Sequence, residues 1–421
     1  MEDVNLKILK LSPYFFPEQI SSTHLTDDLH EAFEKNGFKV EVYTPIPTRG
    51  VSKEVRKKYS KIKCEKLYNG SVIVNRFNMF QEVKNPFLRA IRYILVNIIQ
   101  YFKGCKAKNI EIIYAASTPP TQGLLCALVK KRLEKKYKCH IPLLFSLQDV
   151  FPDSMVQAGM IKTGSFLWKI GSLIEKYTYK NVDKIIVISE DIKINILKKG
   201  VPEHKIEVIR NWIDTKKICP IPNEKNILRK ELKLKDNIFY IVYAGNLGKA
   251  QGIDTILDAA IKLKNHLDIQ FLIFGNGVEE KKIKKRINEE NISNVNIYPL
   301  QPVSRVAEVY SLGDVCIVSC KKGYGQNAFP SKTASIMATG TPIIASFDND
   351  SELCKVIESN NLGICSEPDN PIDLSKKIYY FKENIDKIIE TGKNAREFAE
   401  ENFSKEKCVK KYILLLKELC N

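Results

Sequence analysis

Two kinds of segment alternate along the chain. Short apolar runs, such as residues 6–12 and 39–44, are followed by longer segments in which apolar residues recur at helical spacing. This alternation predicts parallel strands joined by helices, which is the pattern of a doubly wound α/β sheet. We expect further strands at 71–75, 111–115, 142–147, 184–189, 205–209, 239–244, 269–274, 294–298, 314–318 and 342–345.

The alternation is interrupted once, by a polar segment at 215–236, and then begins again with a strand. A chain of 421 residues can form two or three domains that each bury a core. We therefore predict two Rossmann-like domains, at 1–210 and 211–404, that face each other across a cleft. The amphipathic segment at 405–421 is expected to form a helix that packs back on the first domain. The cleft between two such domains is the expected binding site.

A loop and a helix are expected between the last two predicted strands, where residues 323–340 read GYGQNAFPSKTASIMATG. Ser331 is the candidate N-cap of this helix, and Gly340 is expected to end it. Free backbone N–H groups at the helix start attract anions, and Lys332 adds a full positive charge there. The segment therefore predicts an anion site. The alternative is an ordinary strand–helix–strand crossover with Lys332 on a solvated face.

Two carboxylates follow the predicted strand at 142–147. Asp149 and Asp153 lie in the segment QDVFPD, at the carboxyl end of this strand. Ligands of open α/β sheets bind at the carboxyl ends of strands, so both residues are candidate catalytic groups. The alternative is turn chemistry, because aspartates are common in loops next to proline.

The net charge of +17 is unevenly distributed, since residues 49–138 hold 21 basic and 5 acidic residues. Such a region indicates a polyanionic neighbour, either nucleic acid or an anionic membrane surface. The alternative is a lysine-rich chain with solvated side chains. Residues 45–70 are basic and expected to be irregular. Residues 86–103 are expected to form a helix that combines apolar residues with Arg89 and Arg92 and contains no acid. Such a helix suits a membrane interface, and the alternative is a helix in the core of the first domain.

Several classes of protein are disfavoured. No uncharged apolar run reaches about 18 residues, so we expect no transmembrane helix, and the acidic first residues argue against a signal peptide. The 11 cysteines form no CxxC pair, so a reducing cytosol is the expected compartment. No cluster of histidine and carboxylate residues has the spacing of metal ligands, so no metal is expected. The glycine cluster of a dinucleotide-binding turn is also absent after the first strand, so no NAD or FAD cofactor is expected.

Several stretches, taken in order, resemble the family 4 retaining glycosyltransferases, which have the GT-B fold. The resemblance covers nearly the whole chain and is nearest to the bacterial branch that builds O-antigen, capsule and related polysaccharides. That branch includes transferases of N-acetylated deoxyhexosamines such as L-fucosamine. The stretches are SPYFFPEQ at 12–19, LQDVFPDS at 147–154, YAGNLGKAQGIDTILDAA at 243–260, FGNG at 274–277 and FPSKTASIMATGTPIIAS at 329–346.

The resemblance implies transfer of a sugar from a nucleotide-diphosphate sugar to a lipid-linked saccharide, with retention of configuration and without a metal or other cofactor. A UDP-sugar that carries an N-acetylated (deoxy)hexosamine is favoured. The donor is expected on the second domain and the acceptor on the first, with the protein peripheral on the inner face of the cytoplasmic membrane. The expected donor-binding residues are Gly245, Asn246, Lys249, Gly275, Gly277, Asn327, Pro330, Ser331, Lys332, Ser335 and Glu352, and those for the acceptor or membrane are Glu18, Arg89 and Arg92.

This sequence departs from the pattern of the wider family. A Glu-x7-Glu pair is usual there, and the matching positions here are Asn327 and Ser335. The basic pair of the family falls on Asn246 and Gln251. We expect Lys332 to act in its place.

Two further residues of the second domain are candidates for donor binding. Lys249 is expected to help Lys332. Glu352 could replace a carboxylate that binds the ribose, and its alternative is a role as an acid that caps a helix.

Two other functions are alternatives to glycosyl transfer. A nucleotide-sugar 2-epimerase of similar fold would need several acid–base residues around C2 of the sugar, and the chain has only 5 histidines. A nucleic-acid-binding protein would explain the basic region, but no recognisable RNA- or DNA-binding module accompanies it. Glycosyl transfer is therefore the leading hypothesis.

Overall fold

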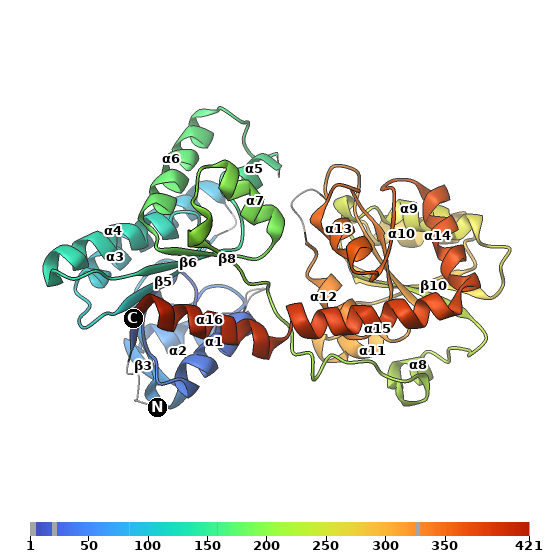
Figure 1. The fold of residues 1–421 in the computed structure, drawn as a ribbon, viewed down its shortest axis with the longest axis horizontal. Coiled ribbons are helices and arrows are strands. Elements are labelled where there is room, and N and C mark those ends of the chain that lie inside the picture. The colour runs from blue at the N-terminus through green and yellow to red at the C-terminus, as the bar shows by residue number, and fades with distance from the viewer. Residues whose placement is uncertain (1–5, 19–22, 84, 158, 326–328, 421) are drawn as a thin grey trace. The chain divides into compact units, whose positions relative to one another are not determined.

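The computed structural model describes the chain except for residues 1–5, 19–22, 84, 158, 326–328 and 421. The chain divides into two compact units (Figure 1). The N-terminal unit comprises Met1–Arg210 and Val409–Asn421, and the C-terminal unit comprises Asn211–Cys408. Each unit contains one sheet with helices on both faces, so the prediction of two Rossmann-like α/β domains is confirmed.

An eight-stranded sheet forms the centre of the N-terminal unit. Its strands are β1 (Lys7–Leu11), β2 (Lys39–Pro45), β3 (Cys64–Leu67), β4 (Val72–Phe77), β5 (Ile112–Ala116), β6 (Leu143–Leu147), β7 (Lys184–Val187) and β8 (Ile206–Val208). They lie in the order β3-β4-β2-β1-β5-β6-β7-β8, and every neighbouring pair is parallel except β3 and β4. The chain order therefore reverses between β1 and β5.

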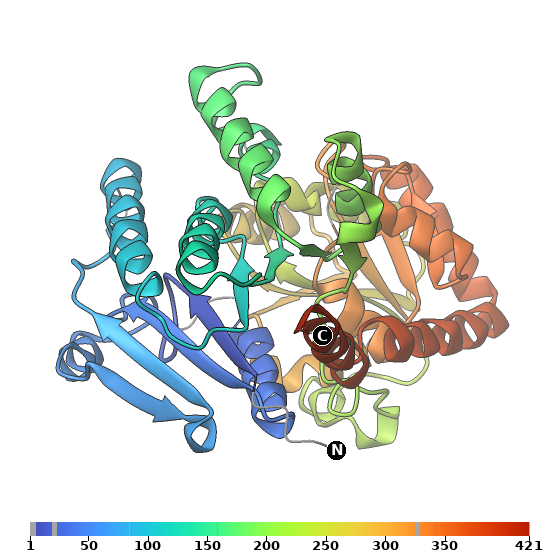
Figure 2. The same cartoon turned by 60° about the vertical axis from the view of Figure 1, so that its left-hand side comes forward.

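Helices cover both faces of this sheet (Figure 2). They are α1 (Thr23–Lys35), α2 (Lys53–Ser60), α3 (Pro86–Gly104), α4 (Gln122–Tyr137), α5 (Asp153–Gln157), α6 (Phe166–Asn181), α7 (Glu190–Lys198) and α16 (Lys405–Cys420), with 3-10 turns η1 (Tyr68–Gly70) and η2 (Glu203–Lys205). Helices α3, α4 and α6 lie in succession on one face, where α4 contacts both of its neighbours. Leu9 and Ile113 belong to the core on this side, whereas Lys10 and Tyr114 face the opposite way, toward His30 of α1 and Tyr412 of α16.

One local prediction for this unit is corrected. Residues 45–70 are not irregular, because they contain α2 and the edge strand β3, which pairs antiparallel with β4. Helix α4 includes most of the basic segment and ends at Tyr137, where Lys138 has a left-handed backbone. Lysine and arginine are good helix formers, and the buried Leu133 anchors this segment to the core.

The C-terminal unit has a six-stranded parallel sheet. Its strands are β9 (Phe239–Asn246), β10 (Ile269–Asn276), β11 (Val295–Tyr298), β12 (Val315–Ser319), β13 (Ile343–Ser346) and β14 (Gly363–Ser366). Their order, β11-β10-β9-β12-β13-β14, is the 3-2-1-4-5-6 order of a Rossmann domain. The chain reverses between β9 and β12, so a ligand is expected where the loops after these two strands diverge.

Helices on the two faces of this sheet enclose two cores. They are α8 (Ile227–Glu231), α9 (Ile253–Lys262), α10 (Glu280–Glu289), α11 (Val306–Tyr310), α12 (Lys332–Ala338), α13 (Glu352–Ser359), α14 (Pro371–Glu383) and α15 (Ile385–Asn402), with 3-10 turns η3 (Asn223–Lys225), η4 (Lys249–Gln251) and η5 (Val303–Arg305). Helices α11, α12 and α15 pack on one face, and α9 and α14 pack on the other.

Candidate functional site

The loops after β9 and β12 are bonded to each other at the switch point of the C-terminal unit. The Ser319 hydroxyl donates a hydrogen bond of 2.6 Å to the carbonyl of Gln251. The amide of Lys321 donates to the carbonyl of Ala250 at 2.9 Å. These two bonds hold the loops together at the edge of the sheet where α12 begins.

Lys332 is the first residue of α12, and its ammonium lies at this edge. Nζ is 3.9 Å from the centre of the Tyr243 ring. Among the described residues, none forms a hydrogen bond or an ion pair with Nζ. Burial lowers the pKa of Lys332 to about 7, because the charged form loses water and gains no carboxylate. An anion at this position would stabilise the charged form.

Tyr243 supports Lys332 from the middle of the sheet. Its side chain is almost completely buried, and its hydroxyl donates to the carbonyl of Asn246 at 2.8 Å. The ring is therefore fixed in position and presents its face to the ammonium, which is a cation–π contact. Tyr243 was not among the residues predicted from the sequence. Its place two residues before Gly245 at the end of an apolar strand was the available signal.

Three glycines expected to contact the donor have different roles. A Cβ atom on Gly245 would meet Lys332 Nζ at 3.5 Å, so this glycine leaves space beside the ammonium. A Cβ on Gly275 would lie 2.4 Å from the carbonyl oxygen of Gly245, and one on Gly277 would lie 2.4 Å from that of Leu247. Gly275 therefore lets the end of β10 approach Gly245 at the end of β9, and Gly277 lets the residues after β10 approach Leu247 just after β9.

The start of α12 differs from the prediction. Ser331 precedes the helix but its side chain forms no capping hydrogen bond, because its backbone is already helical. Pro330 accepts a hydrogen bond from the amide of Thr333 at 3.0 Å, which closes the first turn. Gly340 ends the helix with φ of 66°, as predicted. The helix has only 7 residues, so the side chain of Lys332 carries more of the positive charge than the helix dipole does.

The structure describes only one of the two positions where the wider family has glutamates. Asn327 lies outside the described residues. Ser335 lies on the buried side of α12 and is only 9% exposed. It follows Lys332 by about one helical turn, so it lies farther along α12 on its buried side.

Asp348, at the carboxyl end of β13, shapes the loop after β12. Its carboxylate accepts hydrogen bonds from the amides of Gly323 and Gly325 at 2.8–3.0 Å, and its side chain is buried. Asp348 and Asp350 form an Asp-x-Asp pair, a spacing that can bind a divalent metal. Because backbone amides bind both oxygens of Asp348, this residue of the pair anchors the loop after β12. No group of three or more His, Cys, Asp or Glu side chains gathers as a metal site within the described part of the chain.

The remaining donor candidates lie around the same edge. Asn246 and Lys249 are exposed, and Asn246 Nδ2 lies 3.5 Å from Oε1 of Gln251. Glu352 is in the first turn of α13, is 4% exposed and directly follows the N-cap Ser351. A buried carboxylate at a helix start is stabilised by the helix dipole, which agrees with the capping alternative for Glu352.

The structure distinguishes the two candidate catalytic aspartates of the N-terminal unit. Asp149 is exposed at the end of β6, and its carboxylate has no hydrogen bond or ion pair with any residue that the structure describes. Asp153 begins α5, where Oδ2 lies 3.0 Å from Nζ of Lys199 and accepts a hydrogen bond from Asn195 at 3.1 Å. Only Asp149 is therefore free to act on a ligand without breaking an internal contact.

The residues assigned to acceptor or membrane contact need correction. Glu18 is 3% exposed, and its carboxylate accepts hydrogen bonds from the amides of Phe15, Thr48 and Arg49. It anchors loops and cannot contact a membrane. Arg92 has no exposed side-chain area and donates from Nε to the carbonyl of Phe80 at 3.2 Å, so it cannot contact a membrane either.

Arg89 differs from Arg92 because its side chain is 40% exposed. Its Nε lies 3.0 Å from Glu82. The helix itself contains no acid, but Glu82 lies just before it in the chain. The same segment therefore contains one buried and one accessible arginine, both close to one carboxylate.

Comparison with known proteins agrees with this two-unit architecture. Residues 23–217 match the family model described as Glycosyltransferase Family 4, and residues 224–398 match the model described as Glycosyl transferases group 1. The probable glycosyltransferase WbjE of Pseudomonas aeruginosa is 24% identical over 273 residues, which are 65% of this chain and 66% of that protein. The putative colanic acid biosynthesis glycosyl transferase WcaI of Escherichia coli K12 is 25% identical over 274 residues, which are 63% of this chain and 65% of that protein. The alignments span just under two thirds of these relatives.

A solved structure extends the comparison to the whole fold. Anabaena Alr3699/HepE, in complex with UDP, superposes with a TM-score of 0.69 at 14% identity, over 98% of this chain and 100% of that chain. Identity at this level shows the fold alone. The two family models between them cover most of the chain, one on each unit, and divide it close to Arg210, where the units divide. The chain therefore belongs to the family 4 glycosyltransferases and has their GT-B fold.

Proposed function

We propose that this protein transfers a sugar from a nucleotide-diphosphate sugar to a lipid-linked saccharide, with retention of configuration. The observation that carries the proposal is Lys332, whose ammonium lies beside Tyr243 at the switch point without a counter-ion among the described residues. The diphosphate of a nucleotide sugar supplies the anion that this position lacks. Relatives named for colanic acid and O-antigen biosynthesis support a role in making a surface polysaccharide.

Lys332 would act on the leaving group. When the bond to the sugar breaks, negative charge grows on the diphosphate, and a fixed ammonium stabilises that charge more than it stabilises the intact donor. Asp149 is the candidate to position or deprotonate the acceptor hydroxyl, or to stabilise positive charge at the anomeric carbon. No metal is needed in this scheme, because Lys332 supplies the positive charge.

A UDP-sugar is the proposed donor, with an N-acetylated (deoxy)hexosamine as the sugar. The nucleotide is supported by the HepE structure, which has the same fold and contains UDP. The sugar is supported by the resemblance of the ordered motifs to the bacterial branch that includes transferases of N-acetylated deoxyhexosamines. This part of the proposal concerns specificity and can fail without affecting the reaction class.

The donor proposal is tested with a panel of nucleotide sugars, measured by thermal shift and then by titration calorimetry. A bound donor raises the unfolding temperature by mass action. We expect UDP-sugars to stabilise the wild type and the control Lys264→Met, which removes an exposed lysine at the end of α9, but not Lys332→Met. Equal stabilisation of all three proteins would refute the assignment. Sugar transfer only in the presence of a lipid-linked acceptor would separate a transferase from an epimerase.

We also propose that the N-terminal unit binds a membrane surface through helices α3 and α6. The core-facing side of α3 carries Arg92, Val96 and Gln100, all with no exposed area. Its outward side is apolar, so the usual polarity of a surface helix is inverted. Large apolar side chains are exposed on both helices, namely Phe87 (72%), Ile94 (57%), Leu95 (40%), Ile98 (48%) and Phe102 (61%) on α3, and Phe166 (77%), Leu167 (61%) and Leu173 (68%) on α6.

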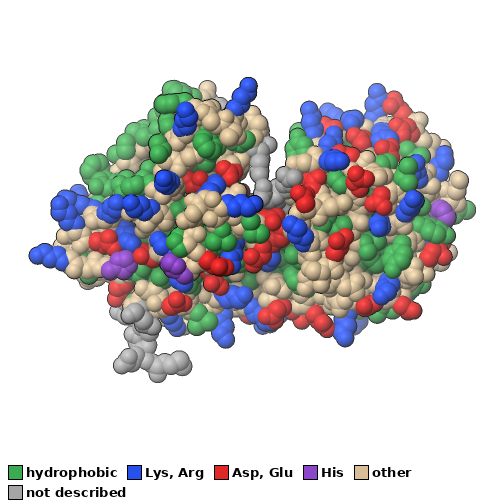
Figure 3. Space-filling view, turned by 45° about the horizontal axis from the view of Figure 1, so that its top comes forward, with side chains coloured by type: hydrophobic (Ala, Val, Ile, Leu, Met, Phe, Trp, Pro, Cys, Tyr) green, Lys and Arg blue, Asp and Glu red, His purple; other side chains and the backbone are tan. Residues whose placement is uncertain are grey.

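The charge beside this apolar area fits an anionic bilayer. Helix α4 lies between α3 and α6, and its second half exposes Lys131, Arg132, Lys135 and Lys136. Figure 3 shows apolar side chains gathered on this part of the molecule, with Lys and Arg side chains beside them. Each basic residue near an anionic surface contributes on the order of 1 kcal/mol, and apolar burial adds a term that salt does not screen. None of the helices in the described part of the chain is long and apolar enough to cross a bilayer.

Flotation with vesicles tests this surface. We expect the wild type to float with vesicles that contain anionic phospholipid and to be released in part by high salt. Ile94→Ser with Ile98→Ser should reduce flotation. The matched control is Ile227→Ser with Ile372→Ser, which replaces two equally exposed isoleucines of the C-terminal unit, at 59% and 53%. Equal flotation of both double variants would refute the proposed surface.

A further inference from the structure

We propose that Arg49 and Arg89 form a binding site for the phosphate or diphosphate headgroup of a lipid, with Glu82 and Arg92 behind them. This inference rests on the proposed function, since it names where the lipid carrier of the acceptor is held. The site lies where three loops meet at the carboxyl edge of the sheet. Tyr14 follows β1, Arg49 follows β2 and Glu82 follows β4, while Arg89 projects from the first turns of α3.

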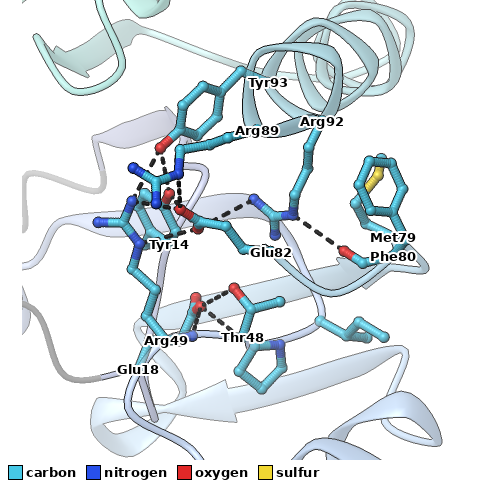
Figure 4. Close-up of polar contacts among 12 residues, drawn as sticks. Tyr14, Glu18, Thr48, Arg49, Met79, Phe80, Glu82, Arg89, Arg92 and Tyr93 are labelled. Carbon is cyan, nitrogen blue, oxygen red and sulfur yellow. Dashed lines mark hydrogen bonds and ion pairs between the residues drawn. The ribbon is translucent and has the colours of Figure 1, made fainter. Parts of the chain in front are cut away.

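Glu82 is the centre of the cluster (Figure 4). Its carboxylate is 7% exposed and accepts hydrogen bonds from Arg49 Nε at 3.0 Å, Arg49 Nη2 at 2.7 Å and the Tyr14 hydroxyl at 2.7 Å. Arg89 Nε lies 3.0 Å from the same carboxylate. Hydrogen bonds and charge from Arg49 outweigh burial, so the pKa of Glu82 lies below its usual value and the carboxylate stays charged. Glu82 therefore orients two arginines at once.

Arg92 changes the charge that this cluster presents. Figure 4 shows Arg49 and Arg89 side by side on one side of Glu82, with Arg92 reaching toward it from the other side. Arg92 Nη1 lies 3.9 Å from Oε2 of Glu82, so its charge already offsets that carboxylate. The second nearby acid, Glu18, is occupied by backbone amides, including that of Arg49. Arg49, Arg89 and Arg92 therefore share the single carboxylate of Glu82, and these four groups together carry a net charge of +2.

Stability alone gives no reason for this arrangement. Arg92 is completely buried, and neither Nη1 nor Nη2 has a hydrogen-bond partner among the described residues. Burying such a group is costly, and apolar residues of similar volume usually stabilise a fold as well or better. A function that requires excess positive charge at this site would explain why the protein retains a buried arginine that lowers its stability.

The exposed parts of the two front arginines fit a phosphoryl group. The side chains of Arg49 and Arg89 are 37% and 40% exposed. Arg49 Nη1 and both Nη atoms of Arg89 have no partner among the residues that the structure describes, so they can donate outward. Paired guanidinium groups bind phosphate oxygens through several parallel hydrogen bonds. Arg49 also stacks on the Tyr14 ring, at 4.3 Å, which limits its movement.

The neighbouring surface indicates that the phosphoryl group belongs to a lipid. Phe87 and Leu88 directly precede Arg89 on α3 and are 72% and 44% exposed. They begin the apolar side of α3, so a headgroup at the arginines would have its hydrocarbon chain beside these residues. A free phosphate ester would gain nothing from this surface.

The experiment uses the full chain and neutral phosphatidylcholine vesicles that carry a small fraction of a polyprenyl diphosphate. We expect Arg49→Gln with Arg89→Gln to weaken binding about tenfold or more, because several charge-assisted hydrogen bonds are lost. The matched control, Lys57→Gln with Lys58→Gln, removes two exposed charges from α2 of the same unit and should bind as the wild type does. Equal loss in both double variants would overturn the proposal.

Glu82→Gln distinguishes an organised site from general attraction to a basic surface. The substitution raises the net positive charge by one, so general attraction predicts tighter binding. An organised site predicts weaker binding, because Arg49 and Arg89 lose the group that orients them. Tighter or unchanged binding would therefore overturn the proposal.

Two further arms identify the source of the phosphoryl group. Equal binding to vesicles with phosphatidylglycerol in place of the diphosphate lipid would assign the site to phospholipid headgroups in general, which also supports a lipid site. Binding of inorganic diphosphate as tight as that of the vesicles would assign it to soluble phosphates and overturn the lipid part. Thermal shift with a UDP-sugar on every variant separates the two proposals. Donor binding should persist when lipid binding is lost, whereas its absence from the wild type would refute the proposed function instead.

Discussion

The ammonium of Lys332 lies 3.9 Å from the centre of the Tyr243 ring, although 89 positions separate the two residues in the chain. Tyr243 belongs to the first strand of the C-terminal sheet, and Lys332 begins the helix after its fourth strand. The strand order places β9 and β12 next to each other and so brings the two residues together. The ring face stabilises a cation that has no carboxylate partner in the described structure, which leaves Lys332 available to an anion.

Lys332→Met should abolish donor binding while making the protein more stable. The ammonium is desolvated, so its pKa of about 7 in the folded state lies below the value of about 10.4 in the unfolded chain. Below pH 7 the folded state bears the full cost of the buried charge, and the cost fades as pH rises toward 10. We expect a gain of up to about 4 kcal/mol at pH 7, measured by urea unfolding, that becomes smaller at pH 9. A less stable variant at pH 7 would contradict this account.

Donor affinity should depend on pH through the same residue. A bound diphosphate favours the charged form and raises the pKa of Lys332 above its donor-free value of about 7. Binding then takes up a proton above pH 7, and affinity should fall by up to about tenfold per pH unit until the pKa of the complex is reached. Calorimetry with a UDP-sugar in buffers of different ionisation enthalpy measures this uptake. Wild-type affinity that is constant from about pH 7 to 9 would exclude the mechanism.

Asp149→Asn and Asp153→Asn should differ in effect. Asp149 is exposed at the end of β6, so its substitution should lower kcat about 100-fold or more and leave stability unchanged. Asp153 pairs with Lys199, so Asp153→Asn should cost up to about 1 kcal/mol of stability and change kcat little. Steady-state kinetics and thermal unfolding of both variants decide the matter. A near-normal kcat for Asp149→Asn would remove it from the mechanism.

Gly275→Ala should damage the donor site through backbone packing. The added Cβ would lie 2.4 Å from the carbonyl oxygen of Gly245, so the paired ends of β9 and β10 must separate. We expect a loss of about 1–3 kcal/mol in stability and weaker binding of the donor. The control is Gly104→Ala in α3, whose Cβ would meet only side-chain atoms, nearest at 3.2 Å. Similar losses of stability and donor affinity in both variants would show that the close approach of Gly275 to Gly245 is not the cause.

Activity should persist in EDTA. The Asp-x-Asp pair at 348–350 is the available metal-binding spacing near the site, and backbone amides occupy both oxygens of Asp348. Lys332 then supplies the positive charge that Mg²⁺ supplies in other transferases. The test measures sugar transfer after dialysis against EDTA. Loss of activity that Mg²⁺ or Mn²⁺ restores would show that a metal is required.

The sequence by itself determined the elements and the two-domain fold. Apolar runs and helical spacing are local properties, so they placed every strand of both sheets except β3 to within a few residues, and also the restart of the pattern near residue 239. Lys332 could also be found locally, because it begins a helix next to a glycine-bearing loop. The short helix α2 was missed, since its 8 residues bury only Tyr59 and so have no apolar side to detect.

The tertiary structure alone decided which side chains are available to a ligand. Arg89 and Arg92 are three positions apart on one helix, yet one is exposed and the other is buried against Glu82. Periodicity indicates that α3 is amphipathic but not which side faces the core, and here the side with Arg92 and Gln100 does. That choice depends on partners distant in sequence. Gln100, for example, donates to the carbonyls of Ser12 and Tyr43. These contacts form only when the sheet assembles, because they join segments that no local pattern connects.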